Sequence, residues 1–205
     1  MFREDVSEQL EEWGVEHRIE DGRFVLQGSK LRVKVPEVTE EIAYLSGYIC
    51  GDGHMVKPQP RKKGGSRYKI IIWFSGSERG RSNSERIRSI IENKFCYEPR
   101  FYVRSQEGKE DWLRVEINSA VVYAFFCCLG LPVGKKSGNL EVPEIFRNES
   151  NFRAFLEGLV DSDGCVQESL RRVTIVQKDK RFLEQVRRLS RRFFDVRFSP
   201  PRSNV

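Results

Sequence analysis

The chain has 205 residues, of which 39% are apolar and 32% charged, and its formal net charge at pH 7 is +6. This size and composition predict one or two globular domains with a substantial core and exclude an intrinsically disordered chain. No apolar run approaches the roughly 18 residues that a membrane-spanning helix needs, so we expect no membrane partner. The N-terminal segment is acidic, unlike a secretory signal or transit peptide, and we therefore expect an intracellular protein of the cytoplasm or nucleoid.

The cysteines and histidines do not form a pattern typical of a zinc site. The chain has five cysteines and two histidines, and no two cysteines are separated by two residues. We therefore expect reduced, packed thiols and no structural zinc ion.

The positive charge is concentrated near the C-terminus. Residues 166–205 contain 11 lysines and arginines against 4 aspartates and glutamates, whereas the residues before them contain 25 against 26. A basic surface confined to one part of a chain favours contact with a polyanion such as nucleic acid, although charged runs also occur on ordinary solvated surfaces.

Residues 1–34 are predicted to contain an acidic helix, a hairpin and a strand. The helix is expected at Val6–Trp13, the hairpin at His17–Gln27 and the strand at Lys30–Val35, where charged and apolar residues alternate. This segment has no counterpart later in the chain, so we expect residues 1–38 to be an N-terminal appendage, either a separate small lobe or the remnant of a host protein.

Residues 39–130 predict one complete αββαββα unit. Its first helix follows Thr39, a favourable N-cap, and a basic, glycine-rich loop is expected at Arg61–Lys69. The remaining predicted elements are strands at Tyr68–Phe74, Arg100–Ser105 and Trp112–Asn118, a helix at Glu85–Phe95 capped by Ser84, and a helix at Ser119–Leu129.

After a linker rich in proline and glycine, the same order of elements restarts and stops early. We predict a helix from about Ser150, strands near Cys165–Glu168 and Arg172–Gln177, and a helix at Lys180–Phe194, with Val196–Ser199 as the start of a third strand. The second repeat is therefore incomplete. An unpaired sheet edge is normally protected, so we expect a fragment, a degraded relative, or a second chain that completes the sheet.

Two stretches of nine residues share one design, LSGYICGDG at Leu45–Gly53 and LEGLVDSDG at Leu156–Gly164. Each has glycine at the third position, a small residue four positions later, and then Asp-Gly. Small residues one helical turn apart leave a groove in which a second helix can pack closely. We therefore expect a pair of helices from which Asp52 and Asp163 emerge side by side.

Two carboxylates at neighbouring helix C-termini are electrostatically unfavourable, because each lies at the negative end of a helix dipole. Like charges so close do not both ionise readily unless a cation lies between them. Mg²⁺ is suitable, since it binds one or two carboxylates together with phosphate oxygens. The alternative is that each Asp-Gly is only a turn after a buried helix, but two matched copies favour a metal site.

The two motifs and the segments around them resemble the LAGLIDADG homing endonucleases, in the single-chain form with two motifs that archaeal introns and inteins encode. The flanking segments are Ile42-Ala-Tyr-Leu45, Leu131-Pro-Val-Gly-Lys-Lys-Ser137 and Val142-Pro143. The resemblance covers about residues 35–198. It implies an α+β fold of pseudo-two-fold αββαββα repeats, in which two antiparallel sheets form a DNA-binding saddle around a central pair of motif helices. The corresponding domains are residues 1–38, 39–149 and 150–205.

The resemblance also implies an activity, the site-specific hydrolysis of both strands of a long double-stranded DNA target. It assigns catalysis and metal binding to Asp52 and Asp163, adds Gly51 and Ser162 to the metal site, and implies Mg²⁺ or Mn²⁺ as the cofactor. Lys178, directly after the second strand of the second half, takes the role of catalytic lysine, and the first half has no lysine at that place. The predicted DNA contacts are Arg61, Lys62, Lys63, Arg67, Lys69, Arg114, Lys135, Lys136, Arg171, Arg172, Gln177, Arg187 and Arg188.

Two other functions stay open from the sequence. A catalytically inactive DNA- or RNA-binding relative, such as a maturase or a regulator, would account for the short second half. The third possibility is a protein without any nucleic-acid partner, in which the two Asp-Gly pairs are only structural turns. The basic C-terminal region and the paired motifs argue against it. The two intact acidic residues favour the enzyme. We expect a monomer, unless another chain completes the second half.

Overall fold

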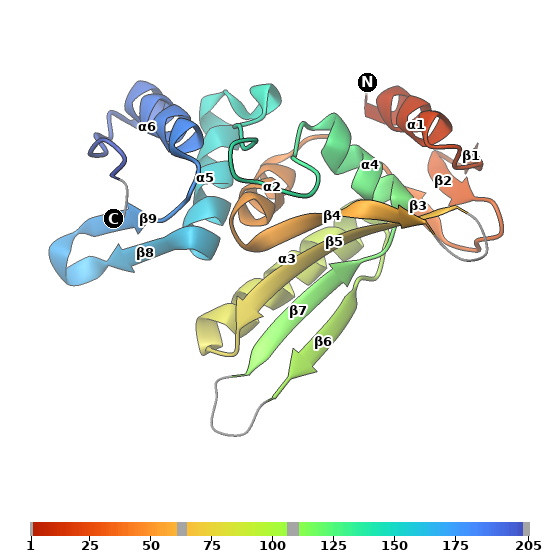
Figure 1. The fold of residues 1–205 in the computed structure, drawn as a ribbon, viewed down its shortest axis with the longest axis horizontal. Coiled ribbons are helices and arrows are strands. Elements are labelled where there is room, and N and C mark those ends of the chain that lie inside the picture. The colour runs from red at the N-terminus through yellow and green to blue at the C-terminus, as the bar shows by residue number, and fades with distance from the viewer. Residues whose placement is uncertain (1, 61–64, 106–110, 203–205) are drawn as a thin grey trace. The chain divides into compact units, whose positions relative to one another are not determined.

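The computed structural model describes residues 2–60, 65–105 and 111–202, and its elements confirm the predicted α+β class (Figure 1). The chain divides into two compact units, one formed by residues 1–38 and 53–129 and the other by residues 39–52 and 130–205. Within the described residues, no helix combines the length and apolarity that crossing a bilayer requires.

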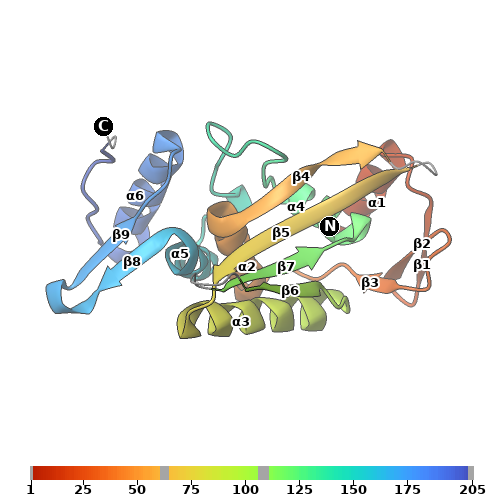
Figure 2. The ribbon, with the colours of Figure 1, turned by 60° about the horizontal axis from the view of Figure 1, so that its bottom comes forward.

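The first unit is built on a four-stranded antiparallel sheet with the strand order β4-β5-β7-β6. The bounds of its elements are β4 Gly53–Pro60, β5 Ser66–Ser75, α3 Glu78–Phe95, β6 Arg100–Arg104, β7 Trp112–Ile117 and α4 Ala120–Cys128. Figure 2 shows α3 running along one face of this sheet. With the helix that precedes β4 in sequence, these elements follow the αββαββα order.

Alternation along the strands separates a buried face from an outward face. On β5, Tyr68, Ile70, Ile72 and Phe74 are buried, whereas the residues between them are partly or fully exposed. On β7 the buried apolar side chains are those of Leu113, Val115 and Ile117, and the strand packs with α3. One face thus builds the core, and the other carries the polar and aromatic side chains.

The N-terminal segment contributes to the core of this same unit. It forms α1 (Phe2–Glu12) and a three-stranded antiparallel sheet of β1 (His17–Glu20), β2 (Arg23–Leu26) and β3 (Arg32–Lys34). Val6 and Leu10 of α1 are fully buried, and α1 packs on α4. Trp13 stacks on Tyr68 with a centroid distance of 4.7 Å, so aromatic packing joins the segment to the central sheet.

The second unit contains the two motif helices and a two-stranded sheet. Its elements are α2 Glu40–Asp52, the 3-10 turn η1 Glu144–Phe146, α5 Glu149–Asp163, β8 Gly164–Gln167, the 3-10 turn η2 Glu168–Leu170, β9 Arg172–Ile175 and α6 Lys180–Phe194. The sheet consists of β8 and β9, paired antiparallel. Phe182 and Val186 bury one side of α6, with Phe182 edge-on to Phe155 of α5.

The backbones of α2 and α5 touch at two glycines, as the motif spacing predicts. A Cβ atom added to Gly47 would overlap the carbonyl oxygen of Phe155, and one added to Gly158 would overlap that of Tyr44. Figure 1 shows the two helices side by side. Because no side chain separates them at these points, the C-terminal ends of both helices meet.

Several predicted boundaries were wrong. Helix α3 starts seven residues before Glu85, at Glu78, where Ser77 accepts a hydrogen bond from the Gly80 N–H; Ser84 is buried inside the helix and donates to Arg81. The hydroxyl of Thr39 has no hydrogen-bond partner among the described residues, so it does not cap α2.

Two predicted segments also differ from the structure. The loop was expected to extend over Arg61–Lys69, but strand β5 begins at Ser66, so the last four residues of that range belong to the strand. No strand forms at 196–199 in the described part of the chain, and the second sheet keeps its two strands.

Replacing Gly158 by alanine should destabilise the protein, because the new methyl group has to push two helix backbones apart. We expect the free energy of unfolding to fall by about 1–3 kcal/mol or more, the range for overpacked cores. Chemical denaturation measures this loss. Ser162→Ala is the control, since it lies on the same helix and makes the side chain smaller; an equal loss in both variants would contradict the close packing.

Candidate active site and nucleic-acid interface

Asp52 and Asp163 are the last residues of α2 and α5, and both belong to the second unit. A Cβ atom added to Gly51 would lie 3.3 Å from Cγ of Asp163, which places the carboxyl group of Asp163 against the end of α2. Asp163 is half-buried, whereas Asp52 is solvent-exposed as a whole residue. The glycine contact between the helices therefore brings the two acids to one place.

Burial raises the pKa of both acids. Burial raises the pKa of Asp163 to about 6, the negative charge of Asp52 adds to this rise, and the positive charge of Lys136 opposes it. The pKa of Asp52 is also raised, because protein atoms partly enclose its carboxyl group while the rest of the residue faces solvent, and again Lys136 opposes the rise. The paired carboxylates are thus short of positive charge.

Lys136, from the linker before η1, supplies part of that charge. Its ammonium group donates hydrogen bonds to the carbonyl oxygens of Cys50, at 3.0 Å, and Gly51, at the negative end of α2. Burial lowers the pKa of Lys136, and the charges of Asp163 and Asp52 work against this lowering. The sequence predicted a phosphate contact for this lysine, and the structure places it beside the acids.

Gln177, after β9, is the second polar side chain that reaches the helix ends. Its Nε2 donates to Oδ2 of Asp163 at 2.6 Å and to the Cys50 carbonyl oxygen at 3.4 Å. Its Oε1 accepts a hydrogen bond from the backbone N–H of Lys178, and Lys178 itself is exposed. Ser162 donates to the carbonyl oxygens of Gly158 and Leu159 inside its own helix.

The donor atoms gathered here are oxygens, and they suit a hard divalent cation. They comprise two carboxylates, at Asp52 and Asp163, and the carbonyl oxygens of Cys50 and Gly51. No group of three or more His, Cys, Asp or Glu side chains able to hold a metal occurs among the described residues. Mg²⁺ typically uses one or two protein carboxylates and completes its coordination with water and substrate phosphate, so this donor set fits such an ion.

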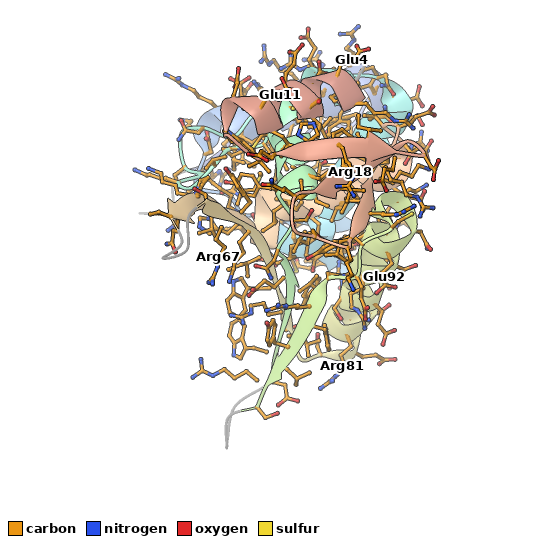
Figure 3. The ribbon with its side chains drawn as sticks, turned by 90° about the vertical axis from the view of Figure 1, so that its right-hand side faces the viewer. Glu4, Glu11, Arg18, Arg67, Arg81 and Glu92 are labelled. Carbon is orange, nitrogen blue, oxygen red and sulfur yellow. The ribbon has the colours of Figure 1, made fainter. Side chains whose placement is uncertain are left out.

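The outward face of the sheet in the first unit is basic and aromatic. Strand register places Trp73, Arg114 and Tyr102 in one row across β5, β7 and β6, and Ser75, Trp112 and Arg104 in the next. A hollow of about 330 Å³ beside these rows is lined by Arg67, Arg100, Glu116 and Asn118. In Figure 3, Arg67 lies on the opposite side of the sheet from Glu92 of α3.

Arg114 is held rigidly at the centre of this face. Its guanidinium carbon lies 4.4 Å from the ring centroid of Tyr102 and 5.3 Å from that of Trp73. A terminal nitrogen lies 3.5 Å from Glu116, which also pairs with Lys69 at 2.8 Å. Burial would raise the pKa of Glu116, but hydrogen bonds from Lys69 and Asn118 and nearby positive charges outweigh it and lower the pKa. Glu116 is therefore a buried anion that fixes two cations.

The other predicted DNA contacts are scattered. Arg67 is exposed on the sheet face, and Lys135, Arg171, Arg172 and Arg188 are exposed in the second unit. Arg187 forms an ion pair with Glu184 on α6 at 2.8 Å. Arg61, Lys62 and Lys63 lie outside the described residues.

Sequence reasoning missed Trp73, Tyr102 and Trp112 as members of the outward face. Alternation in β7 was a signal for Trp112, because this residue has the same parity as Arg114. Trp73 and Tyr102 lie in one row because of the strand register, which pairs residues up to about 40 positions apart. Such pairing produces no local pattern in the sequence.

Comparisons with known proteins agree with this geometry. Residues 151–196 match a family model described as a LAGLIDADG-like domain. A crystal structure of I-DmoI in complex with DNA and Mn aligns with a TM-score of 0.53 and 25% identity, over 77% of this chain and 79% of that one. The homing endonuclease I-WcaI bound to its DNA recognition sequence aligns with a TM-score of 0.53 and 14% identity, over 80% and 72%; at that identity the likeness shows the fold alone.

Two longer proteins contain similar segments. A DNA polymerase of Thermococcus sp. (strain GE8) is 31% identical over 166 residues, and a glutamine–fructose-6-phosphate aminotransferase of Methanocaldococcus jannaschii is 24% identical over 164 residues. The matches cover 80% and 78% of this chain but only 8% and 13% of those proteins.

In metal-free buffer, Asp163→Asn should stabilise the protein at neutral pH and have little effect near pH 4. The folded protein holds a proton on Asp163 more tightly than the unfolded chain does, so stability falls as the pH rises from the usual pKa of 3.8 through about 6. Asparagine stays neutral and avoids this loss. Because the site is partly solvated, we expect a gain on the order of 1 kcal/mol at pH 7.5, or roughly 2–4 °C in Tm. Thermal unfolding in EDTA across this pH range measures the gain; a difference independent of pH would contradict the raised pKa.

Proposed function

We propose that this chain, a member of the LAGLIDADG homing-endonuclease family, binds a long double-stranded DNA site and hydrolyses one phosphodiester in each strand. The observation that carries the proposal is the pair of carboxylates at the ends of α2 and α5, brought together by backbone contact at Gly47 and Gly158. Such a pair is costly without a cation, and a structural turn needs no second carboxylate.

Asp52 and Asp163 would hold Mg²⁺ or Mn²⁺ in this proposal. When bound, the cation polarises the scissile phosphate and lowers the pKa of a water molecule that attacks it. Support comes from relatives crystallised with DNA and either Mn or Ca. Gln177 orients the Asp163 carboxylate through its 2.6 Å hydrogen bond, and the Lys136 ammonium offsets negative charge that develops on the phosphate. Lys178 stays a prediction as an additional cation near the DNA.

The outward sheet face of the first unit would form the base-contacting surface. Its cations match a polyanion, and rings stacked on both sides of Arg114 hold the guanidinium in one orientation. An arginine held in this way can donate two hydrogen bonds to O6 and N7 of guanine in the major groove. We therefore assign a guanine contact to Arg114 and phosphate contacts to exposed residues such as Arg67.

The two longer relatives support a separable module. A polymerase and an aminotransferase share no activity, yet each contains a segment similar to most of this chain over about a tenth of its length. A segment that occurs in two proteins of unrelated activity does not depend on the activity of either protein. This independence agrees with an intron- or intein-derived endonuclease.

A second candidate function is DNA or RNA binding without cleavage, as in a maturase or a regulator. The two-stranded β8–β9 sheet favours it, because this sheet offers a much smaller surface than the four-stranded one. The Lys136 ammonium beside the acids favours it as well, since it already neutralises part of their charge.

Asp52→Asn and Asp163→Asn should each abolish cleavage and leave DNA binding nearly unchanged, because they remove ligands of the cation and no contact to bases. A randomised duplex library incubated with Mg²⁺, with Ca²⁺ as the binding condition, tests both properties together. Cleavage by either variant at the parental rate would exclude the metal site. Retention of DNA by the parental protein without any product would favour the binding-only function.

Arg114→Lys should relax the preference for guanine at one position of the selected site, since lysine lacks the planar pair of donors. We expect discrimination at that position to fall on the order of tenfold. Selection of duplexes in Ca²⁺ gives the base profile of each variant. Arg67→Ala is the control and should weaken binding to all sequences alike, with a salt slope smaller by about 1. An unchanged profile for Arg114→Lys would rule out the assignment.

A further inference from the structure

Asp179, the N-cap residue of α6, joins this helix to the linker through its carboxylate. It is 5% exposed, and its two oxygens accept hydrogen bonds from four backbone N–H groups. Oδ1 accepts from Arg181 and Phe182, at 3.1 and 3.2 Å, in the first turn of α6. Oδ2 accepts from Gly138 and Leu140 in the linker, at 2.8 and 3.2 Å.

The bonds from the linker exceed what a helix cap needs. An N-cap side chain stabilises a helix with one oxygen, and serine performs that role about as well as aspartate. The second carboxylate oxygen of Asp179 reaches about 40 residues back along the chain. A buried carboxylate would be costly without donors, and here the linker provides half of them.

The segments that Asp179 joins carry both polar side chains that reach the ends of α2 and α5. Lys136 lies two residues before Gly138, and its ammonium group binds the carbonyl oxygens of Cys50 and Gly51. Gln177 lies two residues before Asp179 itself and donates to the Asp163 carboxylate. Lysine loses much rotamer freedom when it is held in place, so a fixed backbone beside it reduces that cost.

We infer that Asp179 is a positioning residue for cleavage, because it fixes the backbone from which Lys136 and Gln177 approach the paired acids. The inference rests on the proposed function, since it gives Asp179 a role in the reaction. Asp179 contacts neither DNA nor the acids in this assignment, and it acts through Lys136 and Gln177.

The test is Asp179→Ser, which keeps a capping hydroxyl for α6 and removes the acceptor for Gly138 and Leu140. We expect single-turnover cleavage in saturating Mg²⁺ to slow by roughly tenfold to a hundredfold, the effect of small misplacements of catalytic groups. Affinity for the same duplex in Ca²⁺ should stay within about twofold of the parental value. Asn148→Ser is the matched control, because Asn148 caps α5 through the Asn151 N–H and its other bond, to the Ile145 carbonyl oxygen, is local and distant in sequence from Gly138 and Leu140; it should cut at the parental rate.

A double-mutant cycle separates positioning from general destabilisation. If Asp179 acts through Lys136 or Gln177, the loss caused by Asp179→Ser should shrink in a Lys136→Met or a Gln177→Met background. Equal losses in the parental background and in both of these backgrounds, or a parallel loss of DNA affinity, would overturn the inference. Asp179→Asn is the second variant if the serine protein does not fold, since its amide has one acceptor oxygen and cannot serve both α6 and the linker as the two carboxylate oxygens do. If the parental protein cuts no duplex, the proposed function and this role of Asp179 are both refuted. If the parental protein cuts DNA but no faster than Asp179→Ser, only the role of Asp179 is refuted.

Discussion

The contact between the backbones of α2 and α5 is the constraint on which the site depends. Gly47 and Gly158 allow it because any Cβ atom at these positions would overlap a carbonyl oxygen of the facing helix. Two helices that touch in this way end at the same place, and each ends in an aspartate. The positions of the acids are therefore set by helix packing, which is more rigid than a loop, and not by the side chains around them.

This geometry has an electrostatic cost that the protein offsets only in part. Two carboxylates and the negative ends of two helix dipoles converge, and the pKa of Asp163 is raised to about 6. Lys136 and Gln177 supply hydrogen-bond donors, but the pKa of Lys136 is itself lowered by burial. A site with unneutralised charge is less stable alone and gains more from a divalent cation and an incoming phosphate than a fully neutralised site would.

The sheet of the first unit differs, because two cations at its centre, Lys69 and Arg114, are already paired with Glu116. Glu116 fixes Lys69 and Arg114, and the rings of Trp73 and Tyr102 restrict the guanidinium further. A side chain that is already ordered loses little conformational entropy on binding, which favours selective contacts with bases. The N-terminal segment supports this sheet through Trp13, which stacks on Tyr68, and it buries Val6 and Leu10 on α1, which packs on α4.

The sequence by itself determined the α+β class, the pairing of the two motif helices and the alternation of β7, because helix and strand periods and the spacing of glycines are local properties. The predicted start of α3 and the predicted start of β5 were less accurate, since an N-cap residue decides the first and pairing with a neighbouring strand decides the second. Only the tertiary structure decided that Lys136 and Gln177 reach the acids, that Asp179 fixes the linker, and that Arg114 lies between two rings. Each of these contacts joins residues that are distant in sequence, or depends on strand register, and a local pattern does not encode such a distance.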